Sequence, residues 1–142
     1  MAARFFTSCE WSHCGMIFDD RPNMVYESRL IGGVKTNRLE SVKNRGHWAI
    51  ITVKIHDERE AMNFASRQVG KNYDYLGALG NSRKTGNRWH CTSYVTHAVN
   101  AGGVRLVRDL YDVQPRDLWM LPFDIEDENM PAGKKKDPDD EE

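Results

Sequence analysis

The chain has no long apolar run, few cysteines and no excess of charge of either sign. No apolar run approaches the ~18 residues of a membrane-spanning helix, which predicts no transmembrane segment. Residues 1–8 lack the apolar core of a secretory signal, so we expect a cytoplasmic protein. The three cysteines are an odd number at irregular spacing, which argues against a disulfide framework and favours a reducing compartment.

The charge balance argues against a polyanionic partner. With 20 basic and 21 acidic residues the net charge is -1, so the chain as a whole has no field that would attract nucleic acid. We therefore expect no nucleic-acid partner. The 142 residues are the size of one domain. From residue 126 onward the sequence is polar and charged, which predicts one folded domain over 1–125 and a disordered tail over 126–142.

A β-hairpin is predicted near the start of the chain. Residues 13–18 and 24–28 are apolar runs separated by five loop-forming residues, which indicates a loop longer than a tight two-residue turn. Residues 47–55 form a third run, rich in β-branched side chains and typical of a central strand. The sequence thus predicts three strands by residue 55.

Two helices follow these strands. Asp57 is the predicted N-cap of the first helix, Glu60 is its capping-box partner, and the helix is expected to end at Gly70. The second helix begins at Cys91 and is expected to stop at the glycine pair 102–103. Because an amphipathic helix normally packs on a sheet, we expect the Cys91 helix to cover the predicted strands.

Cys91 lies at the N-terminus of this amphipathic helix. At ~100° per residue, Tyr94, Val95 and Ala98 lie on the same side as Cys91, so the thiol is expected on the buried stripe. His97 points roughly 120° away, which makes it a poor base for a cysteine nucleophile. A partner for the thiol must therefore come from the elements that pack on this stripe.

His13 is the predicted partner. Alternation along the strand places His13 on one face with Gly15, and Cys14 on the opposite face, where we expect it in the core. Gly15 leaves room for a close neighbour. If the hairpin is centred near Asp20, His13 lies across from Glu27 within a residue or two of register. That carboxylate would orient the imidazole.

Together these three residues predict a thiol chemistry. A helix N-terminus and an imidazolium both stabilise a thiolate and lower its pKa from the ordinary ~8.5. Cys91 would attack an amide or ester carbonyl, His13 would protonate the leaving group, and Glu27 would hold the productive tautomer. The backbone N–H of Cys91 is a candidate oxyanion donor.

Further residues near the predicted nucleophile are candidates for binding substrate. Tyr73 and Tyr75 could line the cleft, with plain packing as the alternative. Basic residues before the nucleophile could hold a carboxylate or phosphate, although solvated loop charges are the default. These are Arg83, Lys84 and Arg88. His90 could tune the thiol electrostatically, but an exposed flank is the favoured expectation.

A metal site is not favoured by the pattern of potential ligands. There is no Cys-x-x-Cys pair, and Cys14 points away from His13 on the predicted strand. We therefore predict no metal site and no cofactor.

Several short motifs, taken together, resemble one enzyme superfamily. They are residues 7–17, 25–28, 33–34, 73–77 and 89–95. Their order and spacing resemble the circularly permuted branch of the NlpC/P60 papain-like superfamily, in particular the YiiX/YaeF-like thiol hydrolases, over roughly residues 4–122. The chain departs from many of these proteins because it lacks a Gly-Asp strand before the histidine motif.

This resemblance implies an α+β papain-like fold, with a small antiparallel sheet packed against the helix that starts with the catalytic cysteine. It implies that Cys91, His13 and Glu27 are the catalytic residues. The expected function is a cysteine peptidase or amidase that cleaves an amide bond in a peptide or peptidoglycan fragment through a thioester. A thiol enzyme acting on a lipid-like acyl substrate, as an acyltransferase or phospholipase, is one alternative. An inactive binding or structural module of the same fold is another.

Overall fold

The computed structural model of the protein describes most of the first three quarters of the chain. The described residues are 2–8, of which only the backbone is considered, and 13–74, 88–107, 113, 117–118 and 125–129. Of the predicted substrate-binding residues, Tyr75, Arg83 and Lys84 lie outside this set. So do residues 130–142, which include most of the predicted tail.

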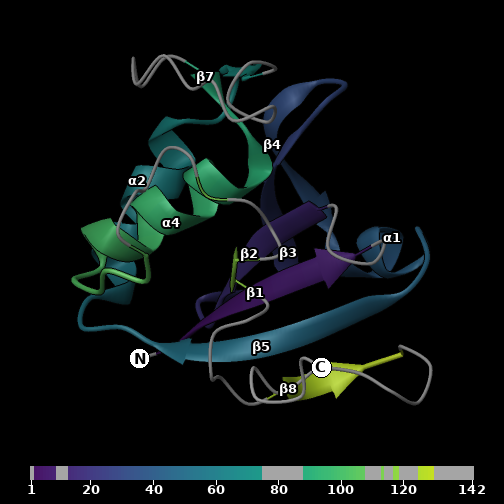
Figure 1. Cartoon of the computed structure of the whole chain (residues 1–142), viewed down its shortest axis with the longest axis horizontal. Helices are drawn as coiled ribbons and strands as arrows, with labels where there is room; N and C mark the ends of the chain where they lie inside the picture. Colours follow the sequence, from purple (N-terminus) through teal and green to yellow (C-terminus); the bar gives the residue numbers. More distant parts are fainter. Residues whose placement is uncertain are drawn as a thin grey trace, which may run out of the picture.

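The described part of the chain forms a mixed α+β fold around a six-stranded sheet (Figure 1). The strand order is β4-β3-β2-β1-β5-β8, and every neighbouring pair is antiparallel. The strands are β1 (Ala2–Ser8), β2 (His13–Phe18), β3 (Arg21–Arg29), β4 (Gly33–Arg38), β5 (Trp48–Lys54) and β8 (Ile125–Glu128). A separate parallel pair joins β6 (Asn72–Tyr73) to β7 (Arg88–Trp89).

The predicted hairpin is present, but its turn is shorter than expected. Strand β3 begins at Arg21, so only Asp19 and Asp20 separate it from β2. The expectation of a loop longer than two residues was therefore wrong. The register shifts between Met16, which pairs with Tyr26, and Phe18, which pairs with Arg21. The shift is a bulge that contains the extra residues of β3. These residues therefore belong to the strand and not to the loop.

Three strands of the sheet were not predicted from the sequence. Strand β1 pairs with β2 on one side and β5 on the other, so it lies inside the sheet. Strands β4 and β8 are edge strands with many polar side chains, which weakens the apolar alternation that identifies a strand. Because β8 covers residues 125–128, the predicted start of the disordered tail at residue 126 was too early.

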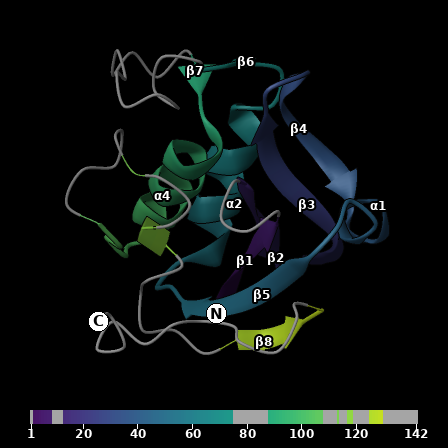
Figure 2. The same ribbon diagram turned by 45° about the vertical axis from the view of Figure 1, so that its right-hand side comes forward.

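Three helices, α1 (Leu39–Lys43), α2 (Glu58–Arg67) and α4 (Cys91–Ala101), cover the sheet in the described regions. Figures 1 and 2 show α2 and α4 side by side on one face. There the Tyr94 hydroxyl donates to the Ala65 carbonyl over 2.7 Å. Helix α1 packs on the other face through Val42. No helix within the described ranges is long and apolar enough to cross a membrane.

Both predicted helices begin where the sequence indicated. The Asp57 side chain caps α2 by accepting from the Glu60 backbone N–H over 3.1 Å. Helix α2 ends at Arg67, three residues before the expected Gly70. Helix α4 begins at Cys91 and stops before Gly102, as predicted.

Strand alternation sorts the core into two layers. From β2, Cys14, Met16 and Phe18 face α2 and α4, whereas Ile17 packs with α1 on the opposite face. Cys14 is fully buried, which confirms its predicted place in the core.

Candidate active site

Cys91 is the first residue of α4 and is 4 % exposed. His90 precedes the helix in an extended conformation (φ -86°, ψ 167°), and the Tyr94 backbone N–H donates to the His90 carbonyl over 3.1 Å. The Cys91 thiol therefore lies within the first turn, where the unsatisfied N–H groups and the helix dipole stabilise negative charge.

The buried stripe of α4 follows the predicted helical phase. Tyr94, Val95 and Ala98 are fully buried. The side expected to be polar is buried as well, since Thr92 and Thr96 have no exposed surface. The Thr96 hydroxyl donates to the Thr92 carbonyl over 3.0 Å, which allows a polar side chain to be buried within the helix. Helix α4 is thus held on nearly all sides, and the position of Cys91 is fixed by packing.

His13, the first residue of β2, contacts both predicted partners. Its Nε2 lies 2.7 Å from Oε1 of Glu27. Its second partner is Cys91, whose interaction with the imidazole helps to raise the pKa of His13. The structure therefore brings Cys91, His13 and Glu27 together, as the sequence predicted.

Gly15 makes the approach of β2 and β3 possible. A Cβ at this position would lie 2.8 Å from Cγ1 of Val25, 3.1 Å from the Tyr26 carbonyl oxygen and 3.2 Å from Cβ of Glu27. Distances this short leave no space for a larger side chain. The expectation that Gly15 makes room for a close neighbour is confirmed, and that neighbour includes Glu27 itself.

Glu27 is fully buried, and both of its oxygens are occupied. Besides His13, Oε1 accepts from Nη1 of Arg45 over 2.6 Å. Oε2 accepts from Nη2 of Arg45 over 3.0 Å and from Nδ2 of Asn37 over 2.8 Å. The forked Arg45 contact fixes the plane of the carboxylate, since a guanidinium matches a carboxylate at two points.

These contacts keep Glu27 charged. Burial alone would raise its pKa, but hydrogen bonds from His13, Arg45 and Asn37 lower the pKa of Glu27 to about 2. An ionised carboxylate only accepts hydrogen bonds, so Nε2 of His13 carries the proton that points to Glu27. The second ring nitrogen, Nδ1, is therefore the one available for chemistry.

The imidazole and the thiol form a charged pair. Burial disfavours the imidazolium, yet hydrogen bonds with Cys91 and Glu27 outweigh it and raise the pKa of His13 to about 9. A hydrogen bond from Cys14 lowers the pKa of the Cys91 thiol well below its ordinary value despite burial, and hydrogen bonds from His13 and His90 lower it further. Both shifts favour the thiolate form of Cys91 beside the imidazolium form of His13.

Cys14 is a contact of the nucleophile that the sequence argument missed. Alternation correctly placed it opposite His13, but α4 packs on the face that carries Cys14. The hydrogen bond to the Cys91 thiolate, together with burial, raises the pKa of Cys14 well above its ordinary value. This shift keeps Cys14 in its protonated form next to Cys91.

The favoured expectation for His90 was wrong, and its alternative is supported. It was expected on an exposed flank but is 1 % exposed, and it lowers the pKa of the Cys91 thiol. The reason is that β7, which ends one residue earlier, pairs with β6 and draws this segment into the fold. Arg45 and Asn37 were missed too, because they lie in a segment whose polar composition indicated only a loop.

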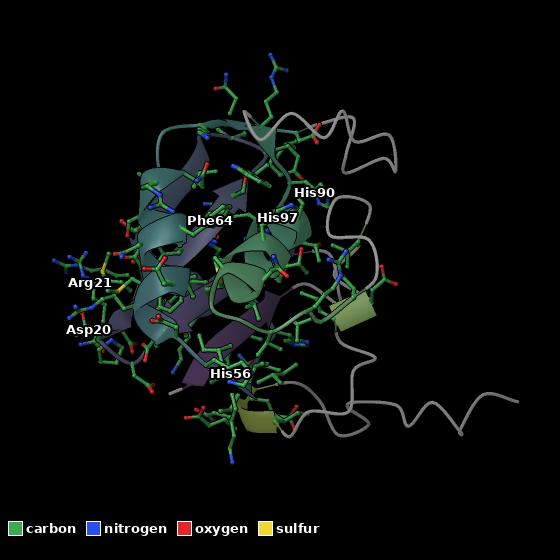
Figure 3. All side chains as sticks on the ribbon, turned by 90° about the vertical axis from the view of Figure 1, so that its left-hand side faces the viewer. Asp20, Arg21, His56, Phe64, His90 and His97 are labelled. Carbon is green, nitrogen blue, oxygen red and sulfur yellow. The ribbon has the colours of Figure 1, made fainter. Side chains whose placement is uncertain are left out.

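His97 lies on a different side of α4. Its Nδ1 is 2.7 Å from the Ser93 carbonyl oxygen, and its ring is 4.7 Å from that of Trp89. Figure 3 shows His97 beside Phe64 of α2, with the ring centroids 6.3 Å apart. These contacts agree with the prediction that His97 is not the base for Cys91.

The remaining candidate residues lie on the short β6–β7 pair. Tyr73 is half-buried and pairs with Trp89, and Arg88 is exposed and pairs with Asn72. Strand β7 ends two residues before Cys91. Arg88 is part of this strand and Tyr73 pairs with it, so both lie on the segment next to the nucleophile. Their contact with a substrate stays a prediction.

No set of metal ligands is found in the described regions. Among these residues no group of three or more His, Cys, Asp or Glu side chains is arranged to hold an ion.

No protein-family model matches the chain, and no curated protein matches it either.

Proposed function

We propose that this protein is a cysteine hydrolase that cleaves an amide bond in a peptide or peptidoglycan-type substrate through a thioester. The observation that supports it best is the position of His13, whose Nε2 lies 2.7 Å from the buried Glu27 carboxylate and whose pKa is raised by the neighbouring Cys91 thiol. A nucleophile, a base and an orienting group in contact define the general arrangement of a catalytic triad.

Each residue would have one role in the reaction. The Cys91 thiolate attacks the carbonyl carbon, and the carbonyl π electrons move to oxygen to give a tetrahedral oxyanion. When the oxyanion collapses, the C–N bond breaks and the His13 imidazolium gives its Nδ1 proton to the leaving amine. In the second half, neutral His13 takes a proton from water as the water attacks the thioester. The acid is released and Cys91 leaves as thiolate.

Glu27 would orient His13 without taking its proton. With a pKa of about 2 and both oxygens already hydrogen-bonded, it remains a carboxylate throughout the cycle. The backbone N–H of Cys91, at the first position of α4, is our candidate donor to the oxyanion.

The fold class is consistent with a permuted NlpC/P60 papain-like hydrolase, and we propose this assignment. The supporting features are the order His13, Glu27, Cys91 along the chain and the packing of α4 on an antiparallel sheet. An acyltransferase or an inactive module would use the same scaffold. Activity on defined substrates separates these three functions.

The test is turnover of soluble muropeptides, peptide amides and aryl esters by the full chain, compared with the Cys91→Ala variant. We expect amide cleavage by the wild type and complete loss in the variant. A trapped thioester that requires Cys91 would be detected by mass spectrometry after acid quenching. Equal turnover by both proteins, or no covalent intermediate and no turnover with any substrate, would contradict the proposal.

A further inference from the structure

The turn between β3 and β4 exposes two adjacent aliphatic side chains. Leu30 is 58 % exposed and Ile31 is 83 % exposed. Within the described ranges the only other large apolar side chain with comparable exposure is Val69, at 46 %. Single exposed apolar residues are common on protein surfaces, but an adjacent pair at the end of a hairpin indicates an interaction site.

Val69 belongs to the same end of the molecule. The Val34 backbone N–H donates to the Lys71 carbonyl over 2.9 Å, and the Gly70 N–H donates to the Val34 carbonyl over 2.9 Å. These bonds join the β3–β4 turn to the segment between α2 and β6. Figures 1 and 2 both show the start of β4 beside the chain that leads to β6.

The charged residues of these two segments are all basic. Residues 28–38 and 66–73 contain no Asp or Glu. The Nζ atom of Lys35 lies over the turn, 2.9 Å from the position of a Cβ on Gly32. We use the name tip surface for the three aliphatic residues together with the four basic residues nearest to them in the sequence, which are Arg29, Lys35, Arg67 and Lys71.

We propose that the tip surface docks on an anionic lipid bilayer. Aliphatic side chains at the end of a turn can enter the acyl region while the surrounding cations meet negatively charged headgroups. The exposed apolar residues are aliphatic and not aromatic, so they offer no platform for stacking nucleic-acid bases. The combination therefore favours a lipid surface over a nucleic acid.

This surface lies near the candidate active site. The Ser28 hydroxyl donates to the Trp89 carbonyl over 2.5 Å. Ser28 lies two residues before Leu30, and Trp89 lies two residues before Cys91. Docking through the tip surface would hold the start of α4 close to the membrane. The inference goes beyond the proposed function, because binding does not require that Cys91 react.

The test is binding of the full chain to vesicles by sedimentation. Vesicles of phosphatidylcholine alone are compared with vesicles containing 30 % phosphatidylglycerol, over a range of salt concentrations. We expect binding to the anionic vesicles that weakens as salt rises. Leu30→Asn combined with Ile31→Asn should reduce affinity by more than about tenfold.

A matched pair of variants tests the role of charge. Lys35→Gln with Arg67→Gln removes one strand lysine and one α2 arginine from the tip surface, and should weaken binding about 25-fold and flatten the salt dependence. Lys54→Gln with Arg59→Gln removes the same two residue types from exposed positions elsewhere. The control should lose far less affinity. Cys91→Ala should bind as the wild type does, which separates this inference from the proposed enzyme activity.

Several results would overturn the proposal. These are no binding of the wild type to anionic vesicles, equal loss in the control and tip variants, or unchanged binding after Leu30 and Ile31 are replaced by Asn. Tighter binding to a single-stranded oligonucleotide than to vesicles would also overturn it. So would dimerisation of the wild type that the Leu30 and Ile31 substitutions abolish. Because the wild-type and charge variants decide the outcome, the test holds even if the aliphatic variant does not fold.

Discussion

His13 and Glu27 meet at 2.7 Å although they are not directly opposite each other in the sheet. Met16 pairs with Tyr26, and the crowding around Gly15 includes Glu27. The imidazole therefore reaches the carboxylate diagonally, across the space that Gly15 leaves empty. This diagonal contact, with Arg45 bonded to both oxygens of the carboxylate, fixes which ring nitrogen of His13 is available to Cys91.

The pH dependence of thiol alkylation is the first prediction. Cys91 should react with iodoacetamide at a rate that reaches its plateau well below the ~8.5 of a free thiol, because Cys14, His13 and His90 stabilise the thiolate. The imidazolium that supports it is present below pH about 9 and is lost as pH rises through that value. Hydrolysis should therefore fall on the alkaline side near pH 9, since protonated His13 is the acid. Alkylation that is quenched at set times and analysed by peptide mass spectrometry distinguishes Cys91 from Cys14. A Cys91 that titrates near 8.5 would favour an inactive module.

Arg45→Met should reduce kcat by about tenfold or more. The substitution removes two charge-assisted hydrogen bonds to Glu27, and each such bond contributes about 1.5–3 kcal/mol. Without them the carboxylate is less well oriented, and its charge acts more strongly on His13. The alkaline limb of the pH–rate profile should therefore move upward. Arg38→Met, at an exposed position in the same region, is the control and should leave both kcat and the profile unchanged. A lower Tm with an unmoved pH profile would show that Arg45 is only structural.

Cys14→Ala should make Cys91 a weaker thiol acid. The Cys14 S–H lowers the pKa of the Cys91 thiol, so its removal should raise that pKa and slow alkylation at pH 6. Cys14→Ser keeps a donor of similar size and should restore most of the rate. The comparison is direct because both variants change the same fully buried position. Identical alkylation profiles for Ala and Ser would argue against the hydrogen bond.

Gly15→Ala should destabilise the fold by about 1–3 kcal/mol, the usual result of overpacking a core. The added methyl would contact Val25, Tyr26 and Glu27 at 2.8–3.2 Å, and the Tyr26 contact is with backbone that cannot simply rotate away. We also expect loss of activity beyond the loss of stability, since Glu27 must shift away from His13. Urea unfolding measures the first effect, and kcat at a temperature where the variant is fully folded measures the second. Wild-type activity in the folded variant would show that the close approach of the two strands is not needed.

The sequence by itself determined the local features of this protein. Helical phase placed Cys91 on the buried stripe of its helix, strand alternation placed Cys14 in the core, and the cap at Asp57 marked the start of α2. These features depend on residues within a few positions of one another, where the geometry of a helix or a strand is fixed. The hairpin could be predicted for the same reason, although its bulge and its two-residue turn could not.

The tertiary structure decided which groups surround the nucleophile. Strand order brings β1 between β2 and β5, and the choice of sheet face puts α4 over Cys14. Arg45 reaches Glu27 from 18 residues away, through a short helix that the sequence pattern did not reveal. Such contacts depend on how whole elements pack, and packing joins residues that no periodicity connects. The sequence thus indicated the three residues in the candidate site, and the packing of the elements determined the charges and hydrogen bonds around them.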